Sequence, residues 1–184
     1  MSEAANAQHF AQPASRVLAS GYSVESWLKD GQAVGTGGIA NPQPTRLLTG
    51  HYHYRFASSS ARRTSQLGGG WWLDFENFNL VQRFAADNGY TLREAARLML
   101  ALPYAWTEVD LLVRALLVKP LRAWTGAGKP AQGAHTGPDL GTRWIPTQHV
   151  VVRQLYVPGL AAPGDATPLF EQVFRQPAEI TRLT

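Results

Sequence analysis

The stretch HYHYRFASSSARRTSQLGGGWWLDFENF, residues 51–78, combines two histidines, two tyrosines, three consecutive glycines and two adjacent tryptophans. Basic and aromatic side chains alternate in HYHYRF, and a period of two is typical of a β-strand. We expect a strand over residues 46–57, in which His51, His53 and Arg55 share one face and the aromatic residues share the other. The aromatic face is suited to a hydrophobic core.

The cationic face of this strand needs a partner. An arginine in a central strand is costly to bury unless an anionic group compensates its charge. A structural carboxylate can fill this role, and so can the phosphate or carboxylate of a ligand, which a guanidinium binds in bidentate fashion. The residues alone leave both interpretations of Arg55 open.

The segment GGGWW, residues 68–72, also has two interpretations. Glycines let the backbone turn sharply or approach a ligand closely. Adjacent tryptophans on a strand point to opposite faces, so one of Trp71 and Trp72 can fill the core while the other lines a pocket. A glycine bend that leads into an ordinary core strand explains the same letters without a ligand.

Helical signals follow directly. Apolar residues recur at helical spacing over residues 75–88, and Asn88-Gly89 is a typical helix end. Capping boxes predict two further helices, over residues 91–102 and 107–119, each ending at a proline. The two boxes are formed by Thr91 with Glu94 and by Thr107 with Asp110.

The flanking regions are expected to form shorter elements. Residues 121–126 and 149–160 are predicted strands, the second buried on both faces because it contains three consecutive valines. Residues 23–31 and 169–176 are predicted short helices, and residues 1–16 a flexible lead-in.

The order of these elements is strand, helices, strand, strand. It predicts an α+β fold with a mostly antiparallel split sheet and a three-helix insertion between the early and late strands. With 184 residues, the chain fits one domain, which we place at residues 17–184.

Composition narrows the functional classes. The chain is 45% hydrophobic and 16% charged, as in globular proteins, and it contains no cysteine, which excludes disulfides and thiol catalysis. No apolar run is long enough to span a membrane, and the first residues lack the apolar core of a signal peptide. We expect action in the cytoplasm, with delivery by a dedicated secretion system if the protein leaves its cell.

The distribution of basic residues does not favour nucleic-acid binding, and the positions of the histidines do not favour a metal site. The net charge is +4, but the arginines are scattered, and Arg62-Arg63 is the one adjacent basic pair. His51 and His53 could chelate a metal from one strand face, but a third ligand is not apparent, since His135 and His149 lie elsewhere in the sequence. No metal cofactor is expected.

At this point the layout resembles that of ADP-ribosyltransferases and NAD glycohydrolases, a family that includes many bacterial toxin domains. HYHYRF would be the strand that holds NAD through His53 or Arg55, and GGGWWLDFENFNLVQRFA (68–85) would be the second strand with its helix. HVVVRQLYVPG (149–159) would be the late strand, with Gln154 at the position of the catalytic glutamate.

This resemblance implies NAD as the substrate and assigns roles to several residues. Arg55 would clamp the pyrophosphate, and Trp71, Trp72 or Tyr54 would stack on nicotinamide. Gln154 would orient the ribose or a water molecule, which favours hydrolysis over transfer to a protein. The resemblance also implies a neutralising partner protein for a toxin.

Glu76 is the reserve candidate for a charged catalytic group. It also has a simpler interpretation, because Asp74 and Glu76 flank the start of a predicted helix, where carboxylates stabilise the positive end of the helix dipole.

Two other functional classes remain open. A protein-interaction module would use the six tryptophans and the arginines as interface anchors, and an RNA- or single-strand-binding domain would place exposed aromatic residues beside a basic groove. A buried Arg55 paired to Asp74 or Glu76, with no cleft beside it, favours the interaction module. A cleft bordered by Arg55, one tryptophan and Gln154 favours NAD chemistry.

Overall fold

The computed structural model describes residues 3–21, 23–29, 32–35, 37–133, 141–147, 150–161 and 167–184, with the backbone alone for 23–29 and 32–35. The predicted α+β class is confirmed, because helices pack against sheets whose described strand pairs are all antiparallel. No helix among the described residues has the length and apolar character needed to cross a bilayer.

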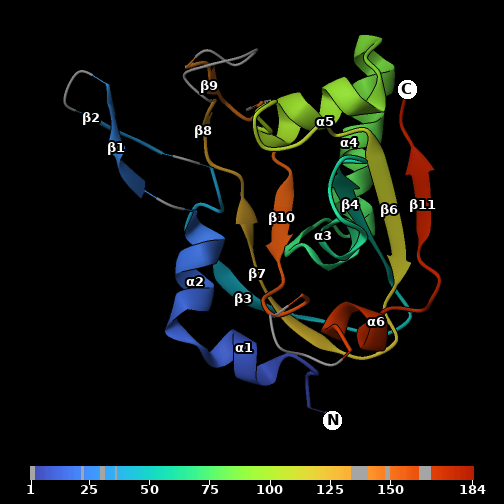
Figure 1. Cartoon of the computed structure of the whole chain (residues 1–184). Helices are drawn as coiled ribbons and strands as arrows, with labels where there is room; N and C mark the ends of the chain where they lie inside the picture. The colour runs from blue at the N-terminus through green and yellow to red at the C-terminus, as the bar shows by residue number, and fades with distance from the viewer. Residues whose placement is uncertain are drawn as a thin grey trace.

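Two sheets form the centre of the fold (Figure 1). The first has the order β3 (Gln43–Leu47), β7 (Leu121–Ala127), β10 (Arg153–Tyr156), β5 (Trp71–Trp72). The second has the order β11 (Glu179–Arg182), β6 (Leu111–Leu116), β4 (Tyr52–Ala57). A bridge between Tyr54 and Leu73 joins β4 to the end of β5, so the two sheets meet there.

Shorter elements surround these sheets. The strand pairs are β1 (Ser23–Lys29) with β2 (Gln32–Gly35), and β8 (Ala131–Gln132) with β9 (Arg143–Trp144). The helices are α1 (Ala7–Ala11), α2 (Pro13–Ser20), α3 (Arg63–Gly68), α4 (Phe75–Asn88), α5 (Leu92–Leu100) and α6 (Leu169–Val173).

The alternation predicted for β4 is confirmed, and it divides the strand between two apolar clusters. Tyr54 and Phe56 face α4 and α5, where the Tyr54 ring stacks on Phe78 at 4.1 Å between centroids. Ala57 belongs to the other cluster, which is built from both sheets and α6, and the buried His53 ring lies 6.5 Å from Phe174 in that cluster. The cationic side of the strand therefore faces the interior as well.

The residues predicted to begin and end α4 and to begin α5 do so in the structure. The Asp74 side chain accepts a hydrogen bond from the Asn77 backbone N–H, and Gly89 ends α4 in the left-handed conformation with φ of 68°. Thr91 and Glu94 form the reciprocal capping box of α5. Local hydrogen bonding thus fixes the start and end of these helices.

The helix predicted over residues 107–119 is wrong. This segment contains β6, which lies between β11 and β4, and its residues are alternately buried and partly exposed. Asp110 does not cap a helix, because its carboxylate accepts hydrogen bonds from the Ser59 backbone N–H and hydroxyl. Three helices do lie between β4 and β6, but one of them is α3, which was not among the predicted helices.

The N-terminal predictions also need correction. Residues expected to be a flexible lead-in form α1 and α2, and the fully buried Asn6 side chain binds the Arg122 backbone N–H and carbonyl and the Pro158 carbonyl. Residues 23–29, expected to be helical, form β1, because the backbone pairs with β2. Ladder pairing overrides local propensity here.

The helix predicted over residues 169–176 is confirmed as α6. Two predicted strands, by contrast, are shorter than expected. Within residues 46–57, β3 ends at Leu47 and β4 begins at Tyr52, because a turn with Gly50 at φ of 86° separates them. The late strand is β10 alone, and Val151 is 58% exposed, so the valine run is not buried on both faces.

Candidate functional site

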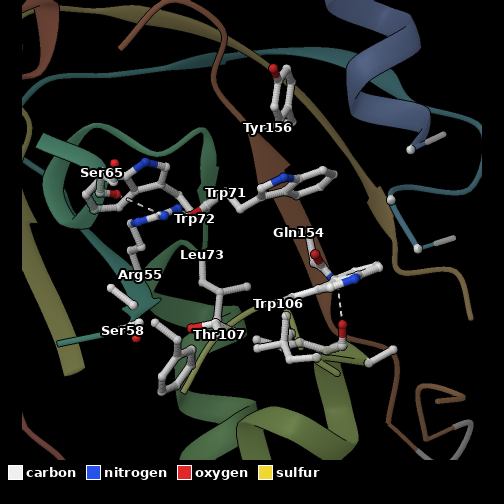
Figure 2. A pocket seen from close by; sticks show the side chains of 18 of the residues that line it. Arg55, Ser58, Ser65, Trp71, Trp72, Leu73, Trp106, Thr107, Gln154 and Tyr156 are labelled. Carbon is white, nitrogen blue, oxygen red and sulfur yellow. Dashed lines mark hydrogen bonds between the residues drawn. The ribbon is translucent and has the colours of Figure 1, made fainter. Parts of the chain in front are cut away.

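A cavity of about 680 Å³ lies where β4, β5 and β10 approach the segment after α5. Five of the residues singled out from the sequence line it: Tyr54, Arg55, Trp71, Trp72 and Gln154. Figure 2 shows Arg55 and Ser65 on one side of the cavity and Gln154 and Trp106 across from them. Residues of three separate strands, β4, β5 and β10, thus line the same cavity.

The lining is apolar and aromatic, with a few uncharged polar groups. Ser58, Ser65, Gln66, Thr107 and Gln132 supply hydroxyl and amide groups. Among the described residues that line the cavity, Arg55 carries the one formal charge, and none is acidic. Such a cavity is suited to a ligand with a planar apolar part and an anionic group.

Arg55 is partly buried and has no carboxylate partner among the described residues. Its guanidinium donates to the backbone carbonyls of Gln66 at 3.0 Å, Trp71 at 3.0 Å and Ser65 at 3.2 Å. The Ser65 and Gln66 carbonyls lie in the last turn of α3, where a helix leaves carbonyls unpaired and its dipole is negative. Arg55 therefore caps α3 and fastens the GGGWW segment to β4.

Arg55 nevertheless keeps its positive charge at neutral pH. Burial lowers the pKa of Arg55 to about 10, so the guanidinium stays protonated at neutral pH. Three of the five N–H groups that an arginine carries are used by the three carbonyls. The other two donors form no hydrogen bond to the described residues, and Arg55 is among the residues that line the cavity.

All three consecutive glycines have neighbours too close to leave room for a Cβ atom. A Cβ atom on Gly69 would overlap the Arg55 guanidinium, and one on Gly70 would overlap the Tyr156 ring. Glycine thus allows the chain to pass closely between Arg55 and β10.

The two tryptophans take opposite roles, as the strand geometry predicts. Trp72 is 3% exposed, its indole N–H donates to the Gly69 carbonyl at 2.7 Å, and its ring lies 4.8 Å from Phe174 in the core. Trp71 is partly exposed in the cavity, and its ring lies 5.0 Å from Tyr156. Trp71 is therefore the tryptophan that can contact a ligand face.

Gln154 reaches the cavity from β10, on the same strand face as Tyr156. Its amide nitrogen lies 3.5 Å from the Leu100 carbonyl at the end of α5, and its amide also lies against Gly128. These contacts point the side chain across the cavity from Arg55 (Figure 2).

His53 and Glu76 are not brought to the cavity. His53 is 3% exposed, burial lowers its pKa to about 4, and its Nδ1 has no hydrogen-bond partner among the described residues. Glu76 is exposed in the first turn of α4, in keeping with its simpler interpretation as a helix-start carboxylate. The charge-compensating carboxylates considered for Arg55, Asp74 and Glu76, form no ion pair with it.

Trp106 and Tyr156 are cavity residues that the sequence did not reveal. Trp106 lies in the segment after α5, which Arg97 holds by donating to the carbonyls of Leu102, Thr107 and Glu108. The Trp106 ring packs against Gly37. The aromatic residues that follow Pro103 could have indicated a ligand-contacting loop. Their position beside the cavity, however, depends on the tertiary fold.

No group of three or more histidine, aspartate or glutamate side chains within the described part of the chain is arranged to hold a metal ion. Of the histidines considered as ligands, His135 and His149 lie outside the described residues. No known protein family, curated protein or solved structure matches the chain.

Proposed function

We propose that the protein cleaves the nicotinamide–ribose bond of NAD by hydrolysis. One observation carries this proposal: Arg55 from the early strand, Trp71 from the second and Gln154 from the late strand line a single cavity. This is the arrangement that the resemblance to NAD glycohydrolases predicts, and it contains no carboxylate paired to Arg55 within the described residues.

The chemical character of the cavity fits NAD. NAD has an anionic pyrophosphate, which Arg55 can attract, and planar rings, which the aromatic walls can contact. The nicotinamide ring carries a positive charge that disappears when it leaves, so an acidic residue to protonate the leaving group is not required. A cavity whose described lining has no acidic residue is compatible with that step.

The proposed hydrolysis needs no reactant other than NAD and water. The bond between the ribose anomeric carbon and the nicotinamide nitrogen breaks, and its electron pair neutralises the ring. Water then forms the new carbon–oxygen bond and releases a proton, which gives nicotinamide, ADP-ribose and H⁺. The cavity would act by positioning and by electrostatic stabilisation of the charged sugar.

Gln154 is assigned the positioning of the ribose hydroxyl or the attacking water. Its carboxamide is neutral, so it can hold a hydroxyl through its oxygen but cannot stabilise a cation as an ionised glutamate does. This supports hydrolysis over ADP-ribosyl transfer to a protein.

The test is a time course of NAD, nicotinamide and ADP-ribose with purified protein and with Gln154→Ala and Trp71→Ala. Gln172→Ala is the matched control, because Gln172 is an exposed glutamine of α6 away from the cavity. We expect NAD loss with the parent and the control, and a fall of about 100-fold or more in both cavity variants, provided that their circular dichroism is unchanged.

NAD that stays intact with the parent protein, even when cell lysate is supplied as acceptor, overturns the proposal. Equal loss of activity in the Gln172→Ala control overturns the assignment of Gln154. If the activity is present, the cell that makes the protein needs a neutralising partner, and the cytoplasm, where NAD is abundant, is the expected place of action.

An exposed aromatic cluster at the cavity rim supports a second candidate, a protein-interaction module. Trp106 is 49% exposed, and Tyr104 packs edge-on against Trp144 at 5.7 Å. Tryptophan and tyrosine are typical interface anchors. This candidate predicts a defined partner that copurifies with the parent and is lost with Trp106→Ala, together with no consumption of NAD.

A further inference from the structure

A second hollow, of about 430 Å³, lies on the other side of α2 from the cavity. Leu18 and Gly21 face the cavity, whereas Arg16 and Ser20 face this hollow, which Lys129 completes from the segment after β7. We call it the α2 hollow. Figure 1 shows α2 beside β3. The hollow is also lined by Asn41 and Pro42, which directly precede β3.

The two cations of the α2 hollow lack counter-ions among the described residues. Within the part of the chain that the structure describes, neither Arg16 nor Lys129 forms an ion pair, and no acidic residue lines the hollow. The segments α1, α2, β3 and β7 contain no aspartate or glutamate at all. Lys129 is partly buried as a residue, so its side chain is held close to the hollow that it lines.

Further arginines lie on the neighbouring strands β3 and β7. Arg46 of β3 stands directly opposite Arg122 of β7 in the register of the two strands. The Phe10 and Trp124 rings stack at 4.6 Å, with the Arg122 guanidinium 4.7 Å from the first ring and the Arg16 guanidinium 5.8 Å from the second. This stack holds Arg16 at the edge of the hollow.

We propose that the α2 hollow binds the phosphate group of a small organic phosphomonoester. A phosphomonoester carries a charge of about −1.5 to −2 at neutral pH, which matches the two cations better than a single carboxylate does. Arg16 can engage two phosphate oxygens and Lys129 a third. Pro13, Val17 and Pro42 offer an apolar rim to the organic part.

A single-stranded nucleic acid fits this face less well. Strand binding relies on aromatic faces that are open to the bases. The Phe10 and Trp124 rings are stacked on each other, and a guanidinium lies over each of them.

The test titrates isotope-labelled protein with phenyl phosphate and follows backbone amide shifts by NMR. We expect shifts at Val17, Ser20, Asn41 and Lys129, and affinity that falls about tenfold or more with Arg16→Gln and with Lys129→Gln. Binding should weaken as the pH falls through about 6, where the phosphate loses its second charge. Arg83→Gln, which removes an exposed arginine from α4, is the matched control and should bind like the parent.

Several outcomes overturn the proposal. Equal affinity for phenylacetate removes the preference for phosphate, and equal weakening by Arg83→Gln shows diffuse attraction instead of a site. Tight binding of an oligothymidylate without binding of phenyl phosphate assigns the face to nucleic acid. Loss of phenyl phosphate binding in Gln154→Ala would place the probe in the cavity, so this test is independent of the proposed NAD hydrolysis.

Discussion

Arg55 and Gly69 fit together so closely that any side chain on Gly69 would occupy the position of the Arg55 guanidinium. The arginine is thereby fixed by the backbone that it binds, since its three hydrogen bonds go to carbonyls on either side of this glycine. This contact joins the early strand to the segment that carries both tryptophans.

Gly69→Ala is therefore expected to destabilise the protein by about 1–3 kcal/mol through overpacking. The effect should be smaller in an Arg55→Ala background, because the group that the new methyl meets has been removed. A double-mutant cycle in chemical denaturation measures this coupling. Additive effects of the two substitutions would contradict the contact.

Trp71 and Trp72 should respond in opposite ways to truncation. Trp72→Ala removes a core ring and a hydrogen bond to Gly69, so we expect a loss of about 3–5 kcal/mol in the free energy of unfolding. Trp71→Ala should lose much less stability but should lower the proposed NAD cleavage by about 100-fold or more. Thermal unfolding and the NAD assay on both variants test this, and a reversed order would contradict the assignment of faces.

The stability of the protein should decrease in mildly acidic solution because of His53. Burial lowers its pKa from 6.5 to about 4, so protonation favours the unfolded chain. The contribution is fully present above pH 6.5 and is lost as the pH falls toward 4, up to roughly 3 kcal/mol.

His53→Gln should flatten the pH dependence of the unfolding free energy in that window. His51→Gln, at an exposed position of the same segment, is the control and should keep the parent's slope. A slope that persists in His53→Gln would assign the dependence to another group.

A second loss of stability is expected at lower pH because of Asp110. Burial alone raises the pKa of Asp110, but the hydrogen bonds from Ser59 and the charge of Arg182 outweigh it, so the pKa lies below its ordinary value of 3.8. This contribution is present above pH 3.8 and is lost as the pH falls below it. Asp110→Asn should lack this acid-dependent loss and should be less stable at neutral pH by about 1–3 kcal/mol, whereas Asp87→Asn, at an exposed position, should behave as the parent.

Asn6 should be essential to the docking of the N-terminal helices. Its amide and carbonyl oxygen make three hydrogen bonds to the backbone of Arg122 and Pro158. Asn6→Ala leaves these buried groups unpaired, so we expect a loss of about 2–3 kcal/mol. Rapid proteolysis of residues 5–20 in the variant, but not in the parent, would report their release, and unchanged protection would contradict this role.

The sequence by itself determined the elements whose signals are local. The capping residues of α4 and α5, the alternation in β4 and the opposite faces of Trp71 and Trp72 depend on side-chain and backbone geometry within a few residues. It also pointed to Arg55, Trp71 and Gln154, which three separate strands bring to one cavity.

The tertiary structure decided what depends on pairing across the chain. Residues 111–116 carry apolar side chains suited to a helix or a strand, and their ladder with β4 and β11 selects the strand. Arg55 finds carbonyls instead of a carboxylate, because α3 ends beside it. Arg46 lies opposite Arg122 only because β3 pairs with β7. Such long-range pairing, unlike local propensity, cannot be read from neighbouring residues.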